Sequence, residues 1–419
     1  MIVKVSSLAY WGLILTILLS ENFLSLIGQD QRIMGVPIID SVLVITVIWI
    51  IAVTLHYKNT NNVKYRFKWV MAFSIILVLL SSIQSYRLYG QEIGLGIRPQ
   101  RYFLVWALSY FPIRKLMANE ILSYEKVERL IYKVGITEIV LYLTQFVLKN
   151  TVTFLAVKKN NVYSSTRYYI STVLLCLLIF ICLDKIFRKE KIVFNSFAIA
   201  SAMVVIIAVG KMRLNFISVA GAIIIGVVLW RKGGSVKMLF VILGVIFVAA
   251  ISNTEVIQSI LPAINRTGKI DTLAIRDIGR EFYLQTVYEH PILGAGYINT
   301  QYHPAYVAAR AGEGISWVDN GIFGIVFFYG GMGFLWIISI FGKIYKHAFK
   351  LLKNSVYLFF VMPLYWIIGC VNEAHWYWSN FLVLVLFVCL LEQALDFHEL
   401  TENEALGMIV GDSSTSDLN

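Results

Sequence analysis

Basic and aromatic side chains recur at helical spacing in the longest polar stretch of the chain, residues 252–317. Its core reads RDIGREFYLQTVYEHPILGAGY, and a helix that stops before Pro291 places Arg276, Arg280 and Tyr283 on one face. Two guanidinium groups one helical turn apart can grip a diphosphate, because each offers planar, paired N–H donors. The spacing therefore predicts an anion-binding face on this helix.

The same spacing has a second interpretation. Asp277 and Glu281 can pair with these arginines and form a solvated, salt-bridged surface without any ligand. The PILGAGY segment that follows, with Gly294 and Gly296, predicts a turn in which the backbone approaches something bulky.

Four more polar residues belong to the candidate site. Arg213 lies in the tight turn VGKMRLNF between two apolar runs, where it faces either a lipid phosphate or only the membrane interface. Asp319 and Asn320 open the next apolar run, as a functional pair or as a helix cap. His303 is a second candidate base, or an ordinary surface histidine.

The sequence contains no Walker loop, dinucleotide fingerprint, DxD pair or HExxH motif, so we expect neither a cofactor nor a metal. The four cysteines lie in apolar runs without ligand spacing and are interpreted as packing residues. The net charge of +11 is typical of basic cytoplasmic loops, and no nucleic-acid partner is expected.

These residues must be positioned by membrane helices. The 419 residues are 58% hydrophobic and 15% charged, with a mean hydropathy of +0.73, and the apolar runs do not alternate. We predict an all-α, polytopic integral membrane protein with about 12 transmembrane helices and one large extracytoplasmic loop. The predicted spans are 8–27, 37–56, 69–86, 102–118, 130–148, 168–184, 192–210, 214–230, 236–252, 318–342, 355–371 and 376–395.

The lysine and arginine bias predicts cytoplasmic N- and C-termini and an extracytoplasmic loop at 253–317. Residues 1–252 then hold the first nine spans, 318–397 the last three, and 398–419 a disordered cytoplasmic tail. Arg98 and Arg101 fall on the outer face against this bias, so they are secondary candidates for anion binding, or simple snorkelling anchors.

In its motifs the chain resembles the bacterial O-antigen polymerase and O-antigen ligase superfamily of polytopic, GT-C-like glycosyltransferases. The resemblance rests on KMRLNFISVAGAIIIG, a large external loop two spans later, Arg276 fifteen residues before the PILGAG element, and the polar pair ahead of GIFGIVFFYGG. The motifs cover about residues 210–335, and the span layout covers the whole chain.

The resemblance implies a metal-independent enzyme of the bacterial plasma membrane. It would transfer an oligosaccharide from polyprenyl pyrophosphate to an acceptor sugar hydroxyl on the extracytoplasmic face, and so build an O-antigen, capsule or exopolysaccharide. Arg213 and Arg276 correspond to the family's phosphate-handling arginines, and Arg280 is added by the helix argument. The ligases carry a histidine where this chain has Asp319, which favours a repeat-unit polymerase over a ligase.

Asp319 is the first candidate for the general base and His303 the second, with Asn320 and Tyr283 as secondary binding residues. Implied partners are the lipid-linked oligosaccharide, membrane lipid, a chain-length regulator and a flippase. Two alternatives stay open: an O-antigen ligase, and a transporter or flippase of polyprenyl-linked oligosaccharide. A transporter would be expected to show repeated halves, and the sequence has no internal repeat.

Overall fold

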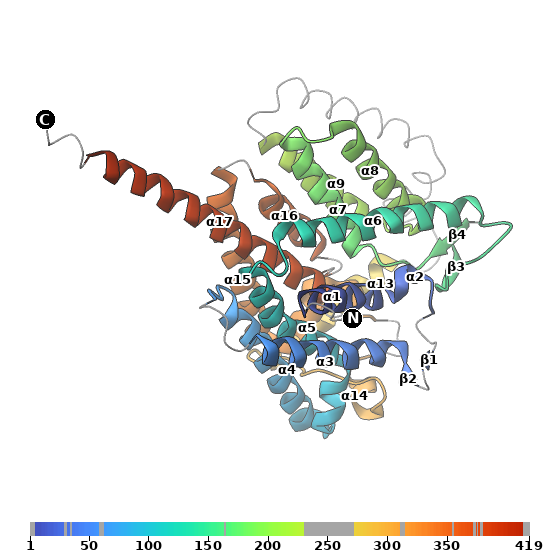
Figure 1. Ribbon diagram of the computed structural model, residues 1–419. Coiled ribbons are helices and arrows are strands. Elements are labelled where there is room, and N and C mark those ends of the chain that lie inside the picture. Colours follow the sequence, from blue (N-terminus) through green and yellow to red (C-terminus); the bar gives the residue numbers. More distant parts are fainter. Residues whose placement is uncertain are drawn as a thin grey trace, which may run out of the picture.

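The computed structural model describes residues 5–28, 32–33, 36–57, 63–162, 165–229, 272–310, 315–353, 356–371, 374, 376–377 and 380–413. These residues fold mainly into helices, with two short antiparallel hairpins (Figure 1). In chain order the elements are α1 (Val5–Ser20), α2 (Asn22–Ser25), β1 (Arg32–Ile33), β2 (Val36–Pro37), α3 (Ile38–His56), α4 (Lys68–Tyr89), α5 (Ile93–Ala118), α6 (Tyr124–Val147), β3 (Lys159–Val162), β4 (Ser165–Tyr168), α7 (Val173–Phe187), α8 (Ile192–Val204), η1 (Val205–Val209), α9 (Arg213–Leu229), α13 (Thr272–Glu289), α14 (His303–Ala308), η3 (Val318–Asn320), α15 (Gly321–Lys353), α16 (Leu358–Gly369) and α17 (Phe381–Ser413).

Five helices among the described residues are long and apolar enough to cross a membrane, and four shorter apolar helices accompany them. Many large apolar side chains on the outside of the chain are exposed, including Ile48, Leu55, Val193 and Phe197. Such surfaces are costly in water and favourable against lipid acyl chains. The predicted class, a helical membrane-embedded protein, is confirmed at this level.

Helices occupy every predicted span that the described residues cover, whereas the predicted span at 236–252 lies outside them. The fourth predicted span belongs to α5, which continues through Pro112, and the sixth to α7, which has only 15 residues. The figure of twelve spans stays a prediction.

The predicted disordered tail is partly wrong. α17 does not end near residue 397 but continues to Ser413 and runs out of the bundle toward the C-terminus (Figure 1). The segment EQALDFHELTENEALGM explains this, because it is rich in leucine, alanine and glutamate, which favour helix even where they are polar.

Helix α7 is almost entirely buried. Every residue from Val173 to Phe187 except Lys185 is buried, and the helix packs against α6, α8 and α16. Asp184 near its end accepts hydrogen bonds from the backbone amides of Tyr357 at 2.7 Å and Leu358 at 3.1 Å. These two bonds satisfy free amides at the start of α16 and fix that helix against α7.

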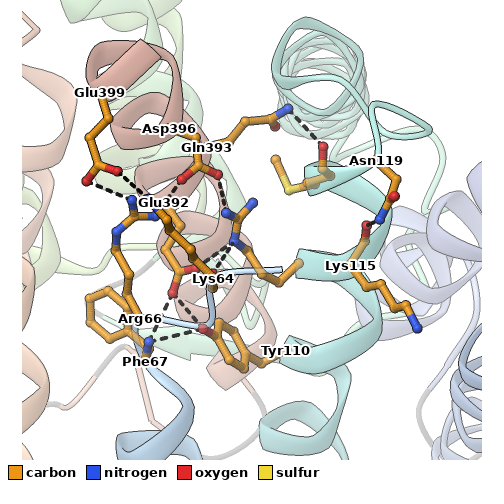
Figure 2. Close-up of polar contacts among 12 residues, drawn as sticks. Lys64, Arg66, Phe67, Tyr110, Lys115, Asn119, Glu392, Gln393, Asp396 and Glu399 are labelled. Carbon is orange, nitrogen blue, oxygen red and sulfur yellow. Dashed lines mark hydrogen bonds and ion pairs between the residues drawn. The ribbon is translucent and has the colours of Figure 1, made fainter. Parts of the chain in front are cut away.

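A buried ion-pair network joins α5, α17 and the segment before α4. Arg114 pairs through Nε with Glu392 at 2.6 Å, and its Nη2 pairs with Asp396. Figure 2 shows Asp396 and Glu399 facing Arg66, at 2.6 and 2.9 Å from its guanidinium nitrogens. The lysine and arginine bias predicts that these three segments lie on one side of the membrane, and the network places them together.

Candidate functional site

The helix predicted to end before Pro291 is present as α13, which ends at Glu289, one residue short of the predicted end at His290. It packs against α15 and against η3, the short turn that opens α15. Arg276 and Asp319 meet at this junction, with 3.6 Å between Nη2 and Oδ1. The Arg276 side chain is 25% exposed and that of Asp319 is 52% exposed, so the pair lies at an open surface.

Arg280 lies one turn further along α13. Its Nη1 is 3.2 Å from Oδ1 of Asp277, and its Nη2 donates to the Val371 carbonyl, two residues after α16, at 3.4 Å. The guanidinium lies 5.6 Å from the ring centre of Phe323 in α15. The alternative of a salt-bridged surface therefore describes Arg280 and Asp277, whereas Arg276 is paired with a residue of another element.

Tyr283 and Asn320 form the buried floor beneath these charges. The Tyr283 ring lies 4.5 Å from that of Phe327, and burial raises the pKa of Tyr283 above its usual value, with the charge of Asp319 adding to the effect. Asn320 donates from Nδ2 to the Ser316 carbonyl at 2.8 Å. Its Oδ1 is buried and has no hydrogen-bond partner among the described residues. That oxygen is therefore left as an acceptor at the base of the site.

Gly279 allows the close contact between α13 and η3, and the sequence analysis did not single it out. A Cβ at this position would lie 2.9 Å from Nδ2 of Asn320 and 3.1 Å from Ile315, so only glycine lets α13 approach η3 this closely. The glycine between two arginines in RDIGREF was the available signal, because a glycine inside a helix usually has a packing reason.

The PILGAGY segment makes the close backbone approach that its glycines predict. Its partners are helices α4 and α15 of the same chain. Gly294 and Gly296 adopt φ of 58° and 73°, and a Cβ on either would lie within 2.4 Å of backbone atoms of α15 or α4. The amide of Ala295 donates to Phe327 of α15 at 2.7 Å, and the amide of Tyr297 to Ser81 of α4 at 3.1 Å. The segment therefore wedges between two helices.

The wedge coincides with a break in α15. Gly330 has φ of 58° and ψ of −148°, values outside the helical region. The Gly331 amide donates to the Pro291 carbonyl at 2.8 Å, and the Met332 amide to the Ile292 carbonyl at 3.2 Å. Broken helices are tolerated at membrane depth when protein satisfies the freed backbone groups, and here the PILGAGY segment does so.

Three predicted site residues lie elsewhere. Arg101 pairs with Asp40 of α3 at 2.5 Å, and Arg98 donates from Nη1 to Gln301 at 3.4 Å. His303 is exposed at the start of α14. Within the described residues no hydrogen bond or ion pair joins any of the three to Arg276 or Asp319.

Arg213 is the first residue of α9, and the packing of that helix indicates which end of the bundle it occupies. A Cβ on Gly221 of α9 would face Ile368, and one on Gly226 would face Val361, so α9 runs antiparallel to α16. The start of α9 therefore lies at the end of α16 that leads to Val371, the residue bonded by Arg280. The backbone of Arg213 is thus at the same end of the bundle as α13.

Comparison with known proteins identifies no matching family model, no similar curated protein and no similar solved structure.

Proposed function

We propose that this protein is a polysaccharide repeat-unit polymerase, a metal-independent, GT-C-like glycosyltransferase of the bacterial plasma membrane. The observation that carries the proposal is the Arg276–Asp319 pair at the open junction of α13, η3 and α15, with Arg280 one turn further along α13 against Phe323. The ordered motifs that resemble the O-antigen polymerase superfamily and the membrane-embedded helical fold support it.

The donor diphosphate would bind at Arg276 and Arg280. The Arg276–Asp319 separation of 3.6 Å exceeds the roughly 2.7–2.9 Å of a tight charge-assisted bond. A loose, exposed pair of this kind contributes little stability, so an incoming diphosphate can displace it at small cost. Arg213, at the same end of the bundle, is proposed as a third cation for this group.

Displacement of the pair also frees Asp319 to act as the base. The acceptor hydroxyl oxygen attacks the anomeric carbon of the donor sugar, and the bond from that carbon to the diphosphate oxygen breaks. Asp319 takes the hydroxyl proton, and polyprenyl pyrophosphate leaves with the bonding electrons. The guanidinium groups neutralise the charge that develops on the leaving diphosphate, which lowers the barrier electrostatically.

Within this proposal Asp319 is preferred to His303 as the base, because Asp319 pairs with Arg276 whereas no such contact joins the exposed His303 to α13 among the described residues. Asn320 and Tyr283 are assigned to the floor of the site, where the free Oδ1 of Asn320 would accept a hydrogen bond from a sugar hydroxyl. The aspartate in the place of the ligases' histidine is the reason to propose polymerisation.

The test uses full-length protein reconstituted in vesicles with a polyprenyl-pyrophosphate-linked repeat unit. We expect products that grow by whole repeats, and no growth with Arg276→Ala. A flippase would move the substrate across the vesicle without lengthening it, and a ligase would add it to a lipid A core acceptor only. Full-length polymer from the Arg276→Ala protein in a deletion strain would refute the assignment.

A chain-length regulator and a flippase are proposed partners of the same pathway step, since a polymerase on the extracytoplasmic face needs lipid-linked units delivered to it. The flippase follows from the proposed reaction, and the chain-length regulator follows from the resemblance alone.

A further inference from the structure

A basic pocket lies near the C-terminal end of α15, whereas Asp319 lies just before the N-terminal end of that helix. It has a volume of about 530 Å³ and is lined by Arg66, Gly342, Lys343, Lys346 and His347. No acidic side chain is among its lining residues. The sequence motif that supplies most of it, GKIYKHAFKLLK, has no part in the proposed glycosyl transfer.

Neither lysine of the pocket forms an ion pair with a carboxylate among the described residues. Asp396 and Glu399 are paired with Arg66, and Glu392 is paired with Arg114. Across the described ranges, no carboxylate lies within 4.0 Å of Lys343 or Lys346. Lys343 instead lies 5.4 Å from the centre of the Phe67 ring. Lys343 and Lys346 are therefore the lining cations that have no ion-pair partner among the described residues.

The ion-pair network holds one wall of this pocket rigid. Arg66 is fixed by two carboxylates of α17, and the amide of the next residue, Phe67, donates to Glu392 at 3.0 Å (Figure 2). The opposite wall is one face of α15, on which Lys343, Lys346 and His347 follow at helical spacing. An arginine held by two carboxylates and a helix face that line the same shallow, open hollow differ from scattered topogenic charges, which need no shared hollow.

We propose that this pocket binds a phosphate-bearing anion, at a site distinct from the candidate active site. The two lie on opposite sides of the break in α15, since Asp319 precedes Gly330 and Lys343 follows it. A basic pocket between membrane helices suits the headgroup of an anionic phospholipid, and a soluble diphosphate compound offers the same chemistry. The two lysines can then bond to the phosphate oxygens, with Arg66 held beside them by its two carboxylates.

The lipid arm of the test measures retention of phosphatidylglycerol against phosphatidylcholine on purified full-length protein by native mass spectrometry. We expect phosphatidylglycerol binding to weaken at least about tenfold in the Lys343→Gln/Lys346→Gln double variant. The matched control, Lys189→Gln/Lys191→Gln, removes two charges from exposed positions outside the pocket and keeps the wild-type affinity.

A second variant fills the space without removing charge. A Cβ on Gly342 would meet no atom within 4 Å, so Gly342→Phe enters the pocket without a clash at its base. We expect it to weaken phosphatidylglycerol binding, while Gly342→Ala does not.

A second experiment compares the same wild-type, pocket-variant and control proteins with inorganic pyrophosphate. The measurement is the shift in the thermal unfolding midpoint in detergent on adding pyrophosphate. Phosphatidylglycerol binding that is lost in both pocket variants supports the site and identifies its ligand as a lipid headgroup. Pyrophosphate protection that is lost in both variants supports the site and identifies its ligand as a soluble diphosphate. Equal binding of both lipids together with no protection by pyrophosphate overturns the proposal, and so does wild-type behaviour of the two pocket variants with both probes.

Discussion

Asp277 and Asp319 provide a matched pair for the acid–base proposal. Each carboxylate is more than half exposed, and each pairs with an arginine of α13. We expect Asp319→Asn to reduce polymer formation by about 10²–10⁴-fold, because the hydroxyl proton loses its acceptor. Asp277→Asn should change the rate of polymer formation by less than about threefold, because Asp277 takes no part in the reaction and only a surface pair is lost. The measurement is the initial rate of chain growth in vesicles.

Equal losses in the two aspartate variants would contradict the role of Asp319 as base. Thermal unfolding midpoints of both proteins serve as the control for folding.

Arg280 and Arg98 allow a second comparison, because both were candidates for phosphate binding and the fold separates them. Arg280 is held between Asp277, Val371 and Phe323, whereas Arg98 contacts Gln301 at the exposed start of α5. We expect Arg280→Gln to lower turnover by about 10–10³-fold through loss of charge stabilisation on the diphosphate. Arg98→Gln should change turnover by less than about twofold. The vesicle assay of chain growth measures both variants. A larger loss of turnover for Arg98→Gln than for Arg280→Gln would place the diphosphate site near Arg98 instead of on α13.

At the scale of elements, the wedge between α4 and α15 predicts a stability effect. A Cβ on Gly296 would lie 2.4 Å from the Ser85 amide nitrogen, and its φ of 73° strains any other residue. We expect Gly296→Ala to destabilise the protein by more than about 2 kcal/mol. Gly94→Ala is the control, because nothing lies within 4 Å of a Cβ there and alanine favours helix. Thermal unfolding in detergent measures both, and an unchanged midpoint for Gly296→Ala would rule out the tight wedge.

The helices themselves were largely predictable from the sequence. Apolar runs flanked by charge marked the positions of α3, α4, α15 and α16, and proline after His290 marked the end of α13. These signals are local, since they depend on hydropathy and on backbone sterics within a few residues.

Long-range contacts were not predictable in the same way. The sequence named both Arg276 and Asp319 but gave no distance between them, and it grouped Arg98 and Arg101 with them on charge alone. The partners of Arg101 and Arg114 come from α3 and α17, far away along the chain. Only tertiary packing decides which of several cations on one face converge.

At the scale of the whole molecule, the network around Arg114 holds α5, α17 and the segment before α4 together. Arg114 and Glu392 are buried, and Tyr110 also donates to Glu392 at 2.6 Å. We expect Arg114→Ala to lower stability by about 3–5 kcal/mol, because Glu392 is left as a buried, unpaired charge. Lys64→Ala, at an exposed pair with Glu399, should cost less than about 1 kcal/mol. Thermal unfolding distinguishes them, and similar midpoints would contradict a structural role for the network.

The two ends of α15 give the sharpest test of orientation, since the candidate active site and the basic pocket lie at opposite ends. The four native cysteines are all buried, so a single introduced cysteine can be labelled selectively. Glu281 on α13 and Lys350 near the end of α15 are both exposed. The lysine and arginine bias predicts that Glu281→Cys reacts with a membrane-impermeant maleimide in intact cells, and that Lys350→Cys reacts only after permeabilisation. The reverse pattern would put α13 in the cytosol, where the proposed transfer on the extracytoplasmic face could not take place.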